Sequence, residues 1–203
     1  MTALVLLDFE AGRIKQPARA AVAAAQALGE VHVLVAGSGV QAAADAAAKL
    51  PGVTKVILAD DPAYANALAE PLAALLVALA PGYSHLLAAA TASGKNVMPR
   101  VAALLDSQPI SDIAGVVDAD TFVRPIYAGN ALATVKSSDA KKVITVRATS
   151  FDPVAEEGGN APIEAAAAMP AQTLSSFVSA ELSKTERPEV TAARVVISGG
   201  RGM

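Results

Sequence analysis

The chain has 203 residues, no cysteine and a formal net charge of −3. This length suffices for one α/β domain with a sizeable core. The lack of cysteine excludes disulfides, thiolate metal sites, iron–sulfur clusters and cysteine nucleophiles. No basic stretch interleaved with aromatic residues occurs, so nucleic acid is not expected as a partner.

Membrane insertion and targeting are also not expected. The longest uninterrupted apolar run, Leu72–Ala80, lies between two prolines and is far shorter than the ~20 residues of a membrane span. The first ten residues carry no basic region and lead directly into a strand, which argues against a targeting peptide. The sequence therefore predicts a cytoplasmic protein. Its two histidines are too few for most histidine metal sites, so no metal site is expected.

Strand-like and helix-like segments alternate through the first 117 residues. Strands are predicted at Leu4–Leu7, Val31–Ala36, Lys55–Leu58, Leu86–Ala90 and Ile113–Val117. Helices are predicted at Gln16–Leu28, Gln41–Leu50, Asp61–Ala80 (Asp61 as N-cap) and Lys95–Leu105, the last regular only from near Met98 because of Pro99. Such alternation favours an α/β fold with a parallel, doubly wound sheet.

Residues Thr121–Phe151 depart from this rhythm. Three β-like runs, Thr121–Tyr127, Ala131–Lys136 and Lys142–Ala148, follow one another with only turn residues between them. We interpret this block as a mixed or antiparallel strand section added to the α/β domain.

The last fifty residues contain fewer signals. Phe151–Ala171 is predicted to be an exposed loop, Ser176–Ser183 is compatible with a strand or a short helix, and Lys184–Pro188 is predicted to be a linker. Ala193–Ile197 is predicted to be a strand that leads into a glycine-rich turn, with no helix after it. We therefore expect residues 1–187 to form the α/β domain, and residues 188–203 to be a linker with the first strand and turn of a second domain.

One loop fits the dinucleotide-binding pattern G-x-G-x-x-A. Gly37–Ala42 joins a predicted strand to a predicted helix, and Asp60 and Asp61 follow about 20 residues later. The glycines would admit a pyrophosphate and an acid would bind the ribose. This suggests a free-standing NAD-type domain of an oxidoreductase, but an ordinary strand–helix turn with Asp61 as a helix cap explains the same residues.

Other candidate sites have plainer explanations. Ser93-Gly94-Lys95 could hold an anion, but it lacks the glycine and the Ser/Thr of a P-loop, so a tight turn is favoured. The acidic pairs Asp118 with Asp120 and Glu156 with Glu157 are interpreted as solvated loop residues, and His32 and His85 as structural residues. No G-x-S-x-G elbow supports hydrolase chemistry, and no catalytic residues are predicted.

The turn Gly199-Gly200-Arg201-Gly202 is the best small-molecule candidate. Glycines expose backbone donors, and an arginine supplies a forked cation for phosphate or a flat surface for an aromatic ring. A flexible chain end is the alternative explanation.

Several stretches, in order along the chain, resemble the α subunits of electron transfer flavoproteins. The first are Gly94-Lys95-Asn96 with Pro99–Ala103, Pro109–Ile113, and the run Thr121–Ala131 (TFVRPIYAGNA). Then follow Thr134-Val135-Lys136, Thr145–Arg147 with Thr149–Phe151, Arg187-Pro188-Glu189 and Val195–Gly202. The resemblance covers essentially the whole chain.

The resemblance implies a carrier rather than an enzyme with substrate turnover. It implies an N-terminal domain of the adenine-nucleotide α-hydrolase type, a β subunit that holds AMP, and a C-terminal domain with most of the FAD site. Acyl-CoA dehydrogenases and related dehydrogenases would supply electrons, and a membrane quinone oxidoreductase would receive them. Arg201 matches the family's flavin-contacting arginine, with Gly199, Gly200 and Gly202 as backbone support. Because the sequence stops just after this turn, we expect the chain alone to hold little or no flavin.

Overall fold

The computed structural model describes residues 1–167, 169, 174–181, 190, 193 and 195–202. At its centre, seven strands form a sheet in the order β12-β5-β4-β1-β6-β11-β7, and every neighbouring pair is parallel. The strands are β1 (Thr2–Leu6), β4 (Glu30–Gly37), β5 (Val53–Asp60), β6 (His85–Ala89), β7 (Pro109–Ile113), β11 (Lys142–Val146) and β12 (Ile163–Ala165). The predicted α/β fold with a mostly parallel sheet is confirmed.

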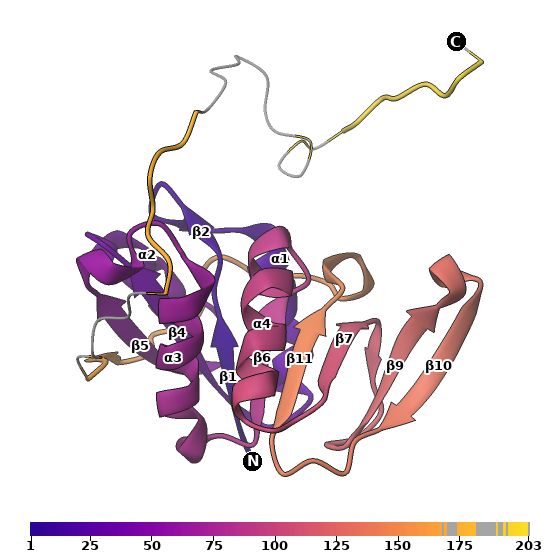
Figure 1. Cartoon of the computed structure of the whole chain (residues 1–203), viewed down its shortest axis with the longest axis horizontal. Coiled ribbons are helices and arrows are strands. Elements are labelled where there is room, and N and C mark those ends of the chain that lie inside the picture. The colour runs from indigo at the N-terminus through magenta and orange to yellow at the C-terminus, as the bar shows by residue number, and fades with distance from the viewer. Residues whose placement is uncertain (168, 170–173, 182–189, 191–192, 194, 203) are drawn as a thin grey trace.

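Both faces of this sheet are covered, which explains its all-apolar strands. Along β1, Ala3 and Val5 belong to one buried cluster, whereas Leu4 and Leu6 belong to the other, because successive side chains of a strand point to opposite faces. Helices α1 and α2 pack in the first cluster, and α3 and α4 in the second (Figure 1). These helices are α1 (Gln16–Gln26), α2 (Gln41–Ala48), α3 (Ala69–Leu79) and α4 (Ala92–Leu104).

The strand order reverses between β1 and β6. From β1 the chain passes through α1 to β4 and through α2 to β5, all on one side of β1. It then crosses through α3 to β6, which lies on the other side of β1. In doubly wound sheets, such a reversal leaves a crevice at the carboxyl ends of the two strands.

Two smaller sheets are added to this core. The antiparallel strands β8 (Gly115–Val116), β9 (Thr121–Ile126) and β10 (Ala131–Lys136) extend beyond the β7 edge, as Figure 1 shows. A hairpin of β2 (Phe9–Glu10) and β3 (Arg13–Ile14) follows β1. The predicted strand block Thr121–Phe151 therefore contributes to two sheets. Its strands β9 and β10 belong to the antiparallel sheet, whereas β11 belongs to the central sheet.

Prolines account for two wrong helix predictions. A single helix was predicted from Asp61 to Ala80, but Asp61 caps only the short turn η1 (Pro62–Tyr64), and α3 begins at Ala69. Pro71 lies in the first turn of α3, where its missing N–H group is not needed, so it favours a helix that begins just before it over one that runs through from Asp61. The opposite error concerns Pro99, which α4 accommodates in its interior, beginning at Ala92 rather than at Lys95.

The strand predictions contain three errors. The segment predicted as one strand, Ile113–Val117, contains the end of β7 and all of β8, which belong to different sheets. Strand β12 lies inside the segment predicted to be a loop. Its three residues pair only with β5, and they show no clear strand pattern. The strand predicted at Ala193–Ile197 is absent from the residues described there.

The residues that the structure describes near the carboxyl end have little regular structure. Residues 176–181 of the undecided segment Ser176–Ser183 form neither helix nor strand, and the predicted linker Lys184–Pro188 lies outside the described residues. The domain boundary near residue 187 therefore stays a prediction. Within the described part of the chain, no helix is long and apolar enough to cross a membrane.

Three-residue 3-10 helices complete the described elements: η1 (Pro62–Tyr64), η2 (Ala80–Gly82), η3 (Tyr127–Gly129) and η4 (Ala148–Ser150).

Candidate functional site

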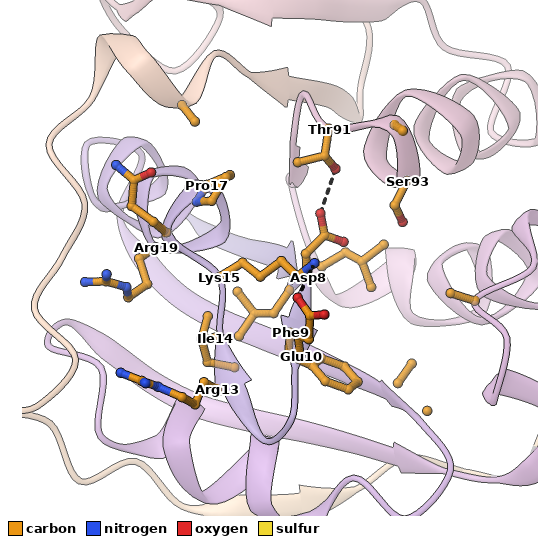
Figure 2. Close-up of a pocket in the computed structure, with 18 of the residues that line it drawn as sticks. Asp8, Phe9, Glu10, Arg13, Ile14, Lys15, Pro17, Arg19, Thr91 and Ser93 are labelled. Carbon is orange, nitrogen blue, oxygen red and sulfur yellow. Dashed lines mark hydrogen bonds and ion pairs between the residues drawn. The ribbon is translucent and has the colours of Figure 1, made fainter. Parts of the chain in front are cut away.

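A cleft of about 1310 Å³ opens at the carboxyl edge of the sheet, where the strand order reverses. Its floor includes apolar side chains from the ends of β1 and β4, among them Leu6, Leu7 and Ala36. Its walls are built by the β2–β3 hairpin, the start of α1, the start of α4 and the residues that follow β11 (Figure 2). Ligands of open α/β sheets bind at this place, so the cleft is the main candidate site.

The two strands at the reversal are joined by a hydrogen bond across the cleft floor. The Thr91 hydroxyl donates to Oδ2 of Asp8 at 2.6 Å, as Figure 2 shows. The same hydroxyl oxygen accepts the Gly94 backbone N–H at 3.2 Å and so caps α4. Asp8 and Thr91 were not predicted as site residues. The available signal was their position, each directly beyond a buried strand at the expected reversal.

Close packing explains the glycine in Ser93-Gly94-Lys95. A Cβ atom on Gly94 would lie 2.0 Å from the carbonyl oxygen of Ala89, a distance that no real side chain tolerates. The segment belongs to the first turn of α4 rather than to a separate tight turn, and Ser93 lines the cleft. The alternative of an anion site at this segment is only partly compatible with the cleft, because Ser93 lines it but Lys95 is not among the lining residues.

One wall of the cleft carries two arginines that share a carboxylate. Glu156 pairs with Arg13 at 3.3 Å and with Arg19 at 3.4 Å. Arg19, with 16% of its side chain exposed, also donates to the Val154 carbonyl at 2.7 Å. Glu156 is an exposed loop acid, as predicted, with 54% of its side chain accessible, but it also has these two arginine partners. Glu156 fastens the segment after β11 to the hairpin and to α1, although no pattern in the sequence links residues so far apart.

The opposite wall contains an ion pair at an irregular point of the sheet. Nε and Nη2 of Arg147 donate to Oδ2 of Asp112, at 3.0 and 2.6 Å. The register between β7 and β11 shifts here, and Asp112 has a φ of +57°, a left-handed conformation that is uncommon outside glycine. The bulge directs the carboxylate to the residue that follows β11. Arg147, which has no partner identifiable in the sequence, thus acquires one through the fold.

The loop Gly37–Ala42, which suggested NAD binding, has its backbone amides occupied by a side chain of the protein. Asp60 accepts the Gly39 N–H at 2.6 Å and the Val40 N–H at 3.1 Å. These are the amides that a pyrophosphate would need, and the acid expected on the ribose occupies them instead. A Cβ on Gly37 would lie 2.5 Å from a methyl group of Val40, so packing accounts for this glycine too. The dinucleotide hypothesis therefore has no support.

The two histidines are structural, as predicted. Nε2 of His85 lies 2.7 Å from the Ala119 carbonyl oxygen, which can only accept, so Nε2 carries the proton and Nδ1 accepts from the Ser84 hydroxyl at 2.8 Å. Burial lowers the pKa of His85 and favours this neutral form. His32 contacts the Tyr83 hydroxyl at 2.8 Å near the amino end of the sheet.

The predicted pair Asp118 and Asp120 has structural partners. Oδ1 of Asp118 accepts the Asp120 N–H at 2.8 Å, and this hydrogen bond lowers the pKa of Asp118. The Asp120 carboxylate forms an ion pair with Lys142. The two acids therefore shape the turn before β9 and attach it to β11, rather than remaining free in solvent. Among the described residues, no group of three or more acids and histidines could hold a metal ion.

The predicted flavin contact, Arg201, lies outside the cleft. Arg201 and the neighbouring Gly199, Gly200 and Gly202 are exposed. A Cβ on Gly200 or Gly202 would meet no atom within 4 Å, so none of the described residues forms a wall around the turn. The described residues around Arg201 therefore do not fit a flavin by themselves, and the assignment of this turn stays a prediction.

Fold and cleft together define a doubly wound α/β chain with a crevice at the point of strand reversal. A family model described as electron transfer flavoprotein domain matches residues 3–175. The chain belongs to the electron transfer flavoprotein family.

Individual relatives place the chain with the α subunits of this family. It is 55% identical over 204 residues to "Electron transfer flavoprotein subunit alpha" of Paracoccus denitrificans and 54% identical to the protein of the same description in Pseudomonas aeruginosa. It is 43% identical over 219 residues to "Electron transfer flavoprotein subunit alpha, mitochondrial" of Dictyostelium discoideum. Each match covers 100% of this chain, but only 66% of the two bacterial relatives and 62% of the Dictyostelium one.

Proposed function

We propose that this chain is the scaffold and subunit-interface part of a heterodimeric, FAD-containing electron carrier. Its membership of the electron transfer flavoprotein family supports the carrier role. The observation that supports the interface role is the antiparallel sheet that extends beyond the compact α/β core (Figure 1).

This antiparallel sheet presents apolar side chains to solvent. Val117, Tyr127 and Leu132 are 60%, 80% and 68% exposed. Strand β10 lies at the edge and pairs only with β9, so its outer backbone groups remain available to another chain. Exposed apolar groups beside an open strand edge are typical of a surface that another protein covers. We propose that the β subunit covers it.

The same sheet is firmly attached to the core, as an interface requires. The side chain of Phe122 is fully buried and lies edge-on to the His85 ring, with 6.4 Å between the ring centroids. His85 and Lys142 hold the turn that precedes β9 through Ala119 and Asp120. Binding to this sheet would therefore position the whole α/β core.

FAD is the proposed cofactor of the carrier. Since the described surroundings of Arg201 do not enclose a flavin, we propose that Arg201 contacts it only in an assembly that closes around the turn. Gly199, Gly200 and Gly202 would then let the backbone approach the ligand closely. The flavin supplies the reversible uptake of electrons, and this chain contributes binding.

The electron donors and the acceptor are proposed by family membership. Acyl-CoA dehydrogenases and related dehydrogenases would reduce the carrier, and an electron transfer flavoprotein–quinone oxidoreductase at a membrane would reoxidise it. We propose that AMP binds to the β subunit, separately from the FAD. The carrier itself would turn over no substrate and would act in the cytoplasm, which cell fractionation can test.

Co-expression with the β subunit tests the interface. We expect Tyr127→Asp and Leu132→Asp together to abolish co-purification of the two chains, whereas Leu104→Asp, which changes an exposed apolar residue of α4, should leave it intact. Unchanged co-purification of the double variant would refute the interface. A complex that never shows a flavin absorbance spectrum would refute the carrier function separately.

A further inference from the structure

We propose that the cleft at the carboxyl edge of this chain's own sheet binds a nucleoside monophosphate. The proposal depends neither on flavin nor on a partner subunit, because every residue that carries it belongs to the described part of this chain. It concerns Asp8, Lys15, Thr91 and Arg147, which line one cleft of about 1310 Å³.

The structure limits the ligand to one nucleotide unit. A dinucleotide would use the glycine loop after β4 as well as the crevice between β1 and β6. Asp60 already occupies the Gly39 and Val40 amides of that loop. A phosphate would therefore have to bind elsewhere in the cleft, beside the residues that follow β1, β6 and β11.

The cations at the cleft have donors to spare for a phosphate. Arg147 and Lys15 each have 41% of their side chain exposed. Arg147 uses Nε and Nη2 on Asp112, and its Nη1 has no hydrogen-bond partner among the described residues. Lys15 contacts Glu10 at 2.9 Å with one of the three protons of its ammonium group. A guanidinium fork and a flexible ammonium are the side chains that commonly bind phosphate.

The rest of the cleft suits a sugar and a base. Oδ2 of Asp8 accepts the Thr91 hydroxyl, whereas its Oδ1 has no hydrogen-bond partner among the described residues and can accept a sugar hydroxyl. Phe9, Val40 and Leu72 add aromatic and aliphatic surface for a flat base. Apolar surface with a few placed polar groups is the usual lining of a small-molecule site.

Calorimetric titration of this 203-residue chain with AMP tests the proposal. The partner subunit is left out, so a nucleotide bound there cannot contribute. We expect saturable 1:1 binding that Lys15→Gln and Arg147→Gln each weaken by about 10-fold or more, the usual effect of losing a charge-assisted hydrogen bond. Lys49→Gln removes the same charge at the far end of α2 and should leave binding unchanged.

Ligand analogues separate the parts of the site. Adenosine and inorganic phosphate should each bind about 10-fold or more weakly than AMP, and NAD should bind no more tightly than AMP, because the glycine loop is closed. Asp8→Asn retains an acceptor for the Thr91 hydroxyl. This variant should bind AMP more weakly and should bind inorganic phosphate as the unchanged chain does.

Three results would overturn the proposal. They are the absence of saturable AMP binding, AMP binding that Lys15→Gln leaves unchanged, and phosphate binding as tight as that of AMP. Lys15 is half-exposed, so its variant remains informative even if Arg147→Gln impairs folding. Circular dichroism checks that each variant is folded.

Discussion

Replacing Asp60 by alanine should destabilise the fold rather than remove a ligand contact. Asp60 ends β5 and accepts two backbone N–H groups, from Gly39 and Val40, at the start of α2. Helix α2 has no side-chain cap of its own and no acidic residue in its first turn. The carboxylate of the neighbouring strand therefore holds the loop that leads into this helix.

The magnitude follows from the two interactions that are lost. Losing a hydrogen bond to a charged group costs about 1.5–3 kcal/mol, and removing a negative charge near a helix N-terminus costs about 0.3–1 kcal/mol. Because Asp60 is exposed and water can replace part of the lost bonds, we expect a loss of about 2 kcal/mol in the free energy of unfolding. For a chain of this size, that corresponds to a decrease of about 4–8 °C in the melting temperature. Asp60→Asn keeps an acceptor but loses the charge, so we expect about half of this loss.

Urea unfolding followed by circular dichroism measures the effect. The matched control is Asp45→Ala, which removes an exposed carboxylate of α2 that bonds only the Gln41 side chain and should change the stability by less than about 0.5 kcal/mol. Equal stability of Asp60→Ala and Asp45→Ala would refute the role of Asp60 in holding the loop before α2. NADH binding that is lost in Asp60→Ala would restore the dinucleotide hypothesis.

Three other substitutions test the packing and the charges that support the site. Lys141→Met removes an ammonium that donates to three backbone carbonyl oxygens beyond α3, so urea unfolding should show a loss of about 2–3 kcal/mol, whereas the exposed Lys49→Met should have little effect. Gly94→Ala should cost about 2 kcal/mol or more because its Cβ collides with a backbone carbonyl, whereas Gly82→Ala, with open space around it, should be neutral or slightly stabilising; thermal melting compares the two. Burial lowers the pKa of His85, so the unfolded chain binds a proton more readily than the folded one. The free energy of unfolding should therefore decrease as the pH falls below about 6.5, and His85→Gln should reduce that dependence.

Local sequence patterns predicted the α/β core because they record burial on both faces of a sheet. The run Leu4–Leu7 indicated a buried strand without any other information, and Leu4 and Leu6 contact one layer of helices while Val5 contacts the other. The strand β12 could not be predicted in this way. It is three residues long, and its pairing with β5 is set by the chain that crosses from the opposite edge of the sheet.

The candidate site was only partly predictable, since its polar contacts join residues far apart in the sequence. Arg147 and Asp112 are 35 positions apart in the sequence. Their pairing depends on a bulge that the residue types of β7 do not predict. Glu156 reaches Arg13 across 143 positions. The sequence offers no local partner for these charges, and the fold places one beside each of them.

Two glycine-bearing loops at the same edge of the sheet show why residue spacing alone does not identify a binding site. Gly37 and Gly39 match a nucleotide-binding pattern, yet the carboxylate of Asp60 from the next strand occupies the amides that the pattern would offer. The turn around Gly94 matches no complete pattern, yet it borders the open cleft beside Asp8. A motif describes which backbone groups a loop can present, whereas binding requires that no neighbouring element already satisfies them. In this fold, Asp60 of β5 satisfies the amides of the loop after β4, which favours the crevice between β1 and β6 as the candidate site.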